Sequence, residues 1–142
     1  MRQISQITTN KVSIHQKTRV AAYCRVSTNS ADQLHSYDRQ VSYYTDYIKS
    51  KSEWQLVEIF ADEGITGTSA NKRPEFLRML RDAKAGLFNL IITREVSRFA
   101  RNTVDTLQYT RELKAKGVEV FFINDNIRTL AGDGELRLSL MA

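Results

Sequence analysis

Short apolar runs alternate with amphipathic stretches along most of the chain, and this alternation predicts strands and helices in turn. We expect strands where apolar residues are continuous or alternate, at residues 20–23, 54–60, 90–93 and 118–123. We expect helices where apolar residues recur every three or four positions, at residues 38–50, 74–86 and 103–116, with another opening at residue 133 or 134. This order is typical of an α/β fold, a three-layer βαβ sandwich around a mostly parallel central sheet.

The apolar positions also predict which helix faces turn toward the sheet. In the helix that starts at Pro74, four residues share one face: Phe76, Met79, Leu80 and Ala83. In the helix at residues 103–116, Val104, Leu107 and Leu113 are expected to point inward.

The pattern divides the chain into three parts. Residues 1–17 are polar without a sustained period, so we expect a flexible N-terminal arm. Residues 18–132 carry the alternating pattern and suit one domain with one core. Residues 133–142 begin an apolar helix with no later sequence to pack on, which favours a fragment of a longer protein.

Polar segments follow three of the predicted strands, at residues 25–33, 62–73 and 95–102. Because sites in parallel sheets form at the carboxyl ends of the strands, we expect these segments to converge. Arg25 and Ser27 are two positions apart, so their side chains leave a strand by the same face. A hydroxyl beside a fixed positive charge is a minimal arrangement for attack on a phosphate.

Further cations would complete such a site. Arg98 and Arg101 are three residues apart and precede a predicted helix, whose N-terminus favours an anion. Arg73 adds a third cation, and Asp62 adds a carboxylate. Guanidinium groups match phosphate oxygens, so the set is suited to phosphoryl transfer in which arginines take the place of a metal ion. A solvated basic turn explains Arg98 and Arg101 equally well, and Ser27 would also suit a turn or a helix cap.

Composition narrows the classes of partner. The formal net charge is +5 and the isoelectric point is near 9.5, which favours a polyanion such as DNA or RNA. A single cysteine, Cys24, excludes an internal disulfide framework and favours a cytoplasmic setting. We expect no membrane partner and no metal site, since long apolar runs and ligand clusters are missing. The absence of a Gly-Lys-Ser/Thr loop argues against a nucleoside triphosphatase.

Three motifs in order resemble those of the serine site-specific recombinases, the resolvase/invertase family. The first is Tyr23-x-Arg25-Val26-Ser27-Thr28, followed by Gln40 at the family's glutamine position. The second is Phe60-x-Asp62-x-Gly64-Ile65-Thr66-Gly67 with Arg73-Pro74, and the third is Ser97-Arg98-Phe99-x-Arg101-Asn102. Order and spacing agree over residues 18–142, and the third motif is similar to that of the large serine recombinases of mobile elements.

The resemblance implies a resolvase-like catalytic domain over residues 18–132 and a role for each residue. Ser27 would be the nucleophile that forms a 5′-phosphoserine link to DNA. The scissile phosphate would be held by Arg25, Arg98 and Arg101, with Arg73 and Gln40 assisting its position. Asp62 would orient an arginine or take part in proton transfer. Lys84 falls where some members carry a functional lysine, although a solvated lysine at a helix end explains it equally well.

The resemblance also implies partners. These are double-stranded DNA and other copies of the chain, as a dimer and as a tetramer in the synaptic complex, with no small-molecule cofactor. Glu135 and the leucines after it resemble the start of the family's oligomerisation helix.

One departure and two alternatives stay open. Many members carry Asp where this chain has Ser97, so the identity of the general acid is open. A non-catalytic α/β module that binds nucleic acid or nucleotides would tolerate Ser27→Ala but not the loss of Arg98 and Arg101. A phosphatase-like hydrolase that uses Ser27 is the other alternative.

Overall fold

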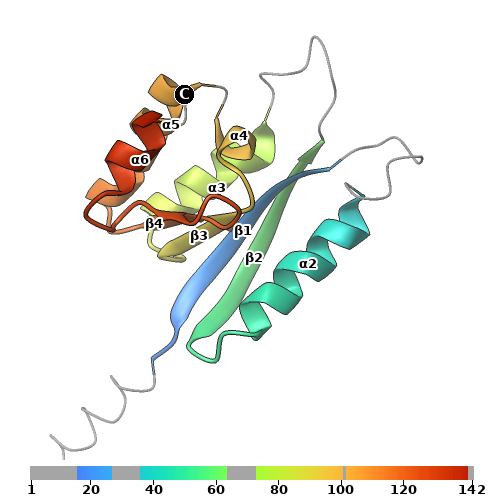
Figure 1. Cartoon of the computed structure of the whole chain (residues 1–142). Coiled ribbons are helices and arrows are strands. Elements are labelled where there is room, and N and C mark those ends of the chain that lie inside the picture. The colour runs from blue at the N-terminus through green and yellow to red at the C-terminus, as the bar shows by residue number, and fades with distance from the viewer. Residues whose placement is uncertain (1–15, 27–35, 64–72, 101, 141–142) are drawn as a thin grey trace, which may run out of the picture.

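A five-stranded sheet forms the centre of the molecule, in the order β2-β1-β3-β4-β5 (Figure 1). The computed structural model describes residues 16–26, 36–63, 73–100 and 102–140. The strands are β1 (Thr18–Val26), β2 (Trp54–Glu63), β3 (Leu90–Thr93), β4 (Glu119–Phe122) and β5 (Ile127–Arg128). The first four strands run parallel, and β5 is antiparallel to β4. The predicted α/β fold with a mostly parallel sheet is therefore confirmed.

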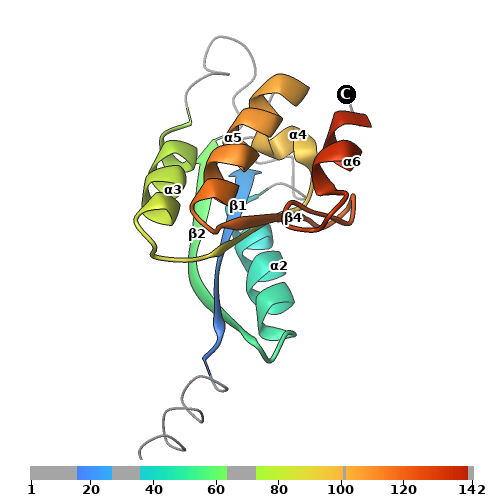
Figure 2. The same cartoon turned by 90° about the vertical axis from the view of Figure 1, so that its left-hand side faces the viewer.

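Helices cover both faces of this sheet and complete the three layers (Figures 1 and 2). They are α2 (Tyr37–Lys49), α3 (Pro74–Lys84), α4 (Val96–Phe99), α5 (Thr103–Ala115) and α6 (Gly134–Leu140). Helix α2 lies on one face, and the other helices lie on the opposite face. Among the described residues, no helix combines the length and the apolar character that crossing a bilayer requires.

The alternating side chains of β1 divide the core into two clusters. Ala21 and Tyr23 belong to the cluster beneath α3 and α5, which also contains Phe76. Val20, Ala22, Cys24 and Val26 belong to the cluster beneath α2. Because both faces of β1 are buried, its sequence is almost continuously apolar up to Arg25, where the strand reaches the edge of the sheet.

Three details differ from the expectation. The segment after β3 contains a short helix, α4, where only a polar connection was predicted. Strand β5 has two residues and was not predicted. Val104 was expected to point inward but is 73% exposed, because α5 packs through Thr106, Thr110 and Leu113 instead. The inward face of α3, by contrast, was predicted correctly.

Candidate active site

The strand register brings two of the predicted site residues to the same edge of the sheet. Arg25 on β1 pairs with Asp62 on β2, one residue before each strand ends. Strand β3 ends at Thr93, just before the segment that contains Arg98. Ser27 and Arg101 lie outside the described residues; in the chain, Ser27 follows Val26, the last residue of β1.

A cavity of about 320 Å³ opens at this edge and collects three of the predicted residues: Arg25, Gln40 and Arg98. The remaining lining residues are Cys24, Tyr44, Arg94, Glu95 and Asn124. Three arginines and one carboxylate are among the lining residues, so their net positive charge favours an anion.

The side chains of the cavity are held in different ways. Gln40 is buried on α2, and the Nε atom of Arg25 is buried with no hydrogen-bond partner among the described residues. The Nε atom of Arg98 donates a hydrogen bond of 3.3 Å to Oε1 of Glu95, one turn earlier on the chain. Arg25 is only partly buried and lines the cavity, so its positive charge is suited to an anionic ligand there.

Asp62 organises the start of α3. Its carboxylate is 3% exposed and accepts hydrogen bonds from the backbone N–H groups of Glu75 (2.9 Å) and Phe76 (3.0 Å). The hydroxyl of Tyr23 donates a third hydrogen bond, of 2.8 Å. Burial and the hydrogen bond to Asp62 raise the pKa of Tyr23, so its hydroxyl stays protonated as the donor.

The expected contact between Asp62 and an arginine is not present among the described residues, whose hydrogen bonds to Asp62 come from Tyr23 and the start of α3. Asp62 supplies the capping oxygens that Arg73, the N-cap residue of α3, does not supply. Asp62 therefore fixes the start of α3, where Arg73 stands.

Arg73 lies beside the cavity and is not part of its lining. Its guanidinium carbon is 3.7 Å from the ring centroid of Phe76, and Nη1 donates a hydrogen bond of 3.2 Å to the carbonyl oxygen of Arg98. Arg73 thus connects the start of α3 to the backbone of α4.

Lys84 is remote from this group of residues. Its Nζ lies 2.8 Å from Oε1 of Glu112, which joins the end of α3 to α5. This partly exposed ion pair explains Lys84 without a role in the cavity.

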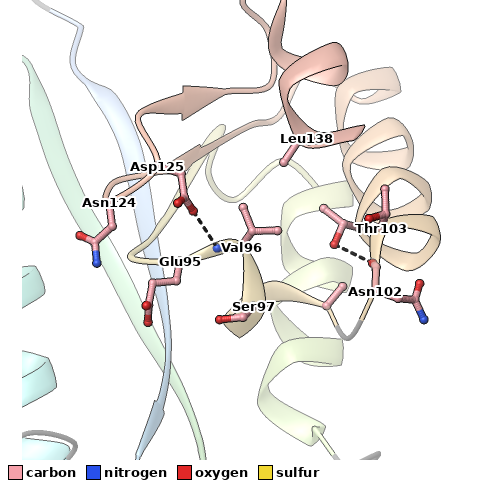
Figure 3. Close-up of a pocket in the computed structure, with 10 residues that line it drawn as sticks. Glu95, Val96, Ser97, Asn102, Thr103, Asn124, Asp125 and Leu138 are labelled. Atoms are coloured by element: carbon pink, nitrogen blue, oxygen red, sulfur yellow. Dashed lines mark hydrogen bonds between the residues drawn. The ribbon is translucent and has the colours of Figure 1, made fainter. Parts of the chain in front are cut away.

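A second hollow, of about 460 Å³, adjoins the cavity on the far side of Glu95 (Figure 3). Ser97 is exposed and lines this hollow, together with Glu95, Asp125 and Leu138. Oδ2 of Asp125 accepts a hydrogen bond of 3.2 Å from the backbone N–H of Val96 and so caps α4. The carboxylate that lines both spaces is therefore Glu95, two residues before Ser97.

Arg94 is a site residue that the sequence reasoning missed. It follows β3 directly, and its backbone N–H donates a hydrogen bond of 3.1 Å to the hydroxyl of Tyr44. The sequence did contain a signal for Arg94, namely its position at the carboxyl end of a buried strand, which Arg25 shares. Glu95 and Asn124 were also missed, and Asn124 carries no sequence signal because it lies in the turn between β4 and β5.

Cys24 lines the cavity and is also a buried member of the cluster beneath α2. Burial, with a smaller effect of the Asp62 charge, raises the pKa of its thiol to about 12. Among the described residues, no group of three or more His, Cys, Asp or Glu side chains could hold a metal ion. The chemistry that the cavity supports is the binding of an oxyanion by guanidinium groups.

A family model and two curated proteins that match this chain bear the names of resolvases or site-specific recombinases. The family model "Resolvase, N terminal domain" matches residues 20–142. Transposon Tn3 resolvase of Escherichia coli is 28% identical over 125 residues, which are 87% of this chain and 60% of that protein. The R46 site-specific recombinase of Escherichia coli is 31% identical over 118 residues, 83% of this chain and 54% of that protein. The chain thus spans about 60% or less of the length of these curated relatives.

Solved structures agree with the fold. The N-terminal catalytic domain of TP901-1 integrase superimposes with a TM-score of 0.73 at 27% identity, covering 87% of this chain and 91% of that one. A resolvase family site-specific recombinase from Streptococcus pneumoniae gives a TM-score of 0.72 at 28% identity, covering 88% and 85%.

Proposed function

The chain belongs to the resolvase family, as its three motifs predicted, and on this premise we propose that it cleaves and rejoins DNA at specific sites through Ser27. The observation that carries the proposal is the cavity of about 320 Å³ in which Arg25, Arg94 and Arg98 meet. Ser27 follows the end of β1 in the chain, two residues after Arg25.

The reaction we propose is an exchange of phosphodiester bonds. The Oγ atom of Ser27 attacks the phosphorus, the bond from phosphorus to the 3′-oxygen breaks, and a phosphoserine ester forms on the 5′ end. Ser27 loses one proton and the departing 3′-oxygen gains one. The ester keeps the energy of the original bond, so attack by a 3′-hydroxyl in the reverse direction rejoins the strands without a cofactor.

In this scheme, arginines supply the positive charge that stabilises the transition state. The phosphodiester gains negative charge as it approaches the transition state, and fixed guanidinium groups stabilise that charge. Arg25 and Arg98 line the cavity, and we assign Arg101 to the same group from its place in the third motif. Gln40 positions the phosphate from α2, and Asp62 and Arg73 fix the α3 side of the site.

The partners we propose are double-stranded DNA and other copies of the chain, as a dimer and as a tetramer that holds the cleaved ends. Two large apolar residues of α6 support self-association, since Leu136 is 63% exposed and Leu140 is 76% exposed. These two leucines are four residues apart and so share one face of α6, which offers an apolar surface to another chain.

Trapping the covalent intermediate tests the proposal. The intact protein is incubated with a duplex that carries its recombination site, and the products are separated under denaturing conditions. We expect a protein–DNA adduct with the unmodified protein and none with Ser27→Ala. Ser52→Ala, at an exposed serine between α2 and β2, is the matched control and keeps the adduct.

An adduct that persists in Ser27→Ala contradicts the assignment of the nucleophile. A protein that forms no adduct but loses DNA binding on Arg98→Gln is the non-catalytic module. Turnover of small phosphate esters without an adduct indicates the phosphatase-like hydrolase.

A further inference from the structure

A third hollow lies beside the proposed active site, between α2 and the turn that follows β3. It measures about 510 Å³ and is lined by Asp38, Arg39, Ser42, Tyr43 and Arg94. Arg94 also lines the cavity that holds Arg25 and Arg98. Arg94 therefore borders both spaces, so successive phosphates of one DNA strand could occupy them.

Two tyrosines of α2 hold Arg94 in place. Its guanidinium carbon lies 4.6 Å from the ring centroid of Tyr43, and its backbone N–H donates a hydrogen bond to the hydroxyl of Tyr44. A stacked guanidinium is oriented by the ring and keeps its outer N–H groups free to donate. These contacts orient the side chain and the backbone of Arg94 in the absence of a ligand.

The charge of Arg94 is not neutralised within the described part of the chain. Four of the other ten arginines there form ion pairs, such as Arg78 with Glu75 and Arg128 with Glu119, whereas Arg94 forms none. Its Nε atom is buried and has no hydrogen-bond partner among the described residues. A partly buried positive charge without a counter-charge is a costly arrangement that a nearby anionic ligand relieves.

The other lining residues fit a singly charged anion. Arg39 is exposed and adds a second cation, Ser42 adds a hydroxyl, and Asp38 adds one negative charge. The lining therefore carries a net charge of one positive unit, which matches the single negative charge of a phosphodiester. Tyr43 contributes the ring on which Arg94 stacks.

We propose that this hollow binds a DNA backbone phosphate next to the one that is cleaved, with Arg94 as its main cation and Arg39 and Ser42 as further donors. The proposal rests on the proposed function, because it takes the adjoining cavity as the site of the cleaved phosphodiester. A contact to the neighbouring phosphate would fix the direction of the strand across the site without reading its sequence.

The salt dependence of DNA binding tests this site. Affinity for a fluorescently labelled duplex is measured by anisotropy with the intact protein over a range of sodium chloride concentrations. Each phosphate contact contributes about 0.9 to the slope of log affinity against log salt concentration. We expect Arg94→Gln to reduce that slope by about 0.9 and to weaken binding equally on unrelated sequences.

Matched variants separate charge from shape. Arg94→Lys keeps the charge and should keep the slope. Arg81→Gln removes one exposed arginine from α3 that lines none of the three spaces, and it should leave the slope unchanged. Arg39→Gln, on the exposed surface of α2, should also lower the slope. If Arg94→Gln does not fold, Arg39→Gln still tests whether the hollow binds a phosphate.

The outcomes distinguish this site from the proposed function. If Arg98→Gln lowers the slope but Arg94→Gln and Arg39→Gln match Arg81→Gln, the second phosphate site is overturned and the active site stands. If none of these variants lowers the slope, the second phosphate site and the placement of the cleaved phosphate in the cavity are both overturned, whereas the adduct experiment decides separately whether Ser27 is the nucleophile. If inorganic phosphate raises the melting temperature of the protein only when Arg94 is present, while the DNA slopes are equal, the ligand is free phosphate and the DNA contact is overturned.

Discussion

The hydroxyl of Tyr23 on β1 donates a hydrogen bond of 2.8 Å to the carboxylate of Asp62 on the neighbouring strand β2. The same carboxylate caps the first turn of α3, so one buried group connects two strands and a helix. Tyr23 and Asp62 belong to the first and second sequence motifs, and their contact explains why both motifs extend beyond the residues that line the cavity.

Loss of this carboxylate should destabilise the fold. Asp62→Ala leaves the Tyr23 hydroxyl and two backbone N–H groups without an acceptor, and we expect the free energy of unfolding to fall by about 3 kcal/mol. Tyr23→Phe removes one hydrogen bond and should cost about 1.5 kcal/mol. Urea denaturation measures both, and additive losses in the double mutant would contradict direct coupling.

Removal of a cavity arginine should slow cleavage more than it weakens folding. We expect Arg98→Gln to lower the rate of strand cleavage about a hundredfold or more, because a preorganised charge at the transition state is lost. Arg98→Lys should fall in between, since an ammonium cannot form the two parallel hydrogen bonds of a guanidinium. Single-turnover cleavage with Arg81→Gln as control measures this, and equal rates in Arg98→Gln and Arg81→Gln would refute it.

Glu95 should influence the rate through Arg98. Their hydrogen bond is 3.3 Å long and both side chains are more than one-third exposed, so Glu95→Gln should change the free energy of unfolding by less than about 1 kcal/mol. Cleavage should nevertheless slow severalfold, because the guanidinium of Arg98 loses the partner that aligns it. A cleavage rate equal to that of the unmodified protein would show that Arg98 is aligned by other groups.

Chelation of divalent metal should not affect cleavage. In the proposed reaction, guanidinium groups supply the positive charge that metal ions supply to many phosphoryl-transfer enzymes. We expect the cleavage rate to be the same with and without EDTA. A magnesium-dependent endonuclease in the same buffer confirms that the chelator acts, and loss of adduct formation in EDTA would contradict the arginine mechanism.

Alkaline pH should destabilise the protein through Cys24. Its pKa rises from 9.0 to about 12 on folding, so the unfolded chain releases the thiol proton at a lower pH than the folded protein does. The stabilisation is complete below pH 9 and is lost as the pH rises from about 9 toward about 12. Urea denaturation at pH 8 and pH 10 measures the loss, and we expect Cys24→Ala to make it smaller.

The sequence predicted the layers of the fold and the edge at which the site forms, because buried parallel strands and amphipathic helices leave strong periodic signals. It placed Val104 wrongly, because α5 packs partly through Thr106 and Thr110, whose methyl groups pack like apolar residues but are counted as polar. Strand β5 was missed because two residues carry no period.

Within the site, the motifs named Arg25, Gln40 and Arg98, which do meet in one cavity. They did not indicate that Arg73 contacts the backbone of Arg98, since the partner of a long side chain depends on tertiary packing. Arg94 lies outside the three motifs, although it follows the end of β3 and so stands at the same edge of the sheet as Arg25.

The hydrogen bond from Arg73 to the carbonyl oxygen of Arg98 couples α3 to α4, so a displacement of one helix is transmitted to the other. A substitution beneath α3, such as a smaller residue at Phe76, would shift Arg73 and with it the backbone that carries Arg98. Such a variant should cleave DNA slowly, because Arg98 is displaced from the phosphate that it binds in the proposed reaction. Kinetic defects from core positions in this domain should therefore be interpreted as misalignment of a phosphate ligand, even where no altered side chain reaches the cavity.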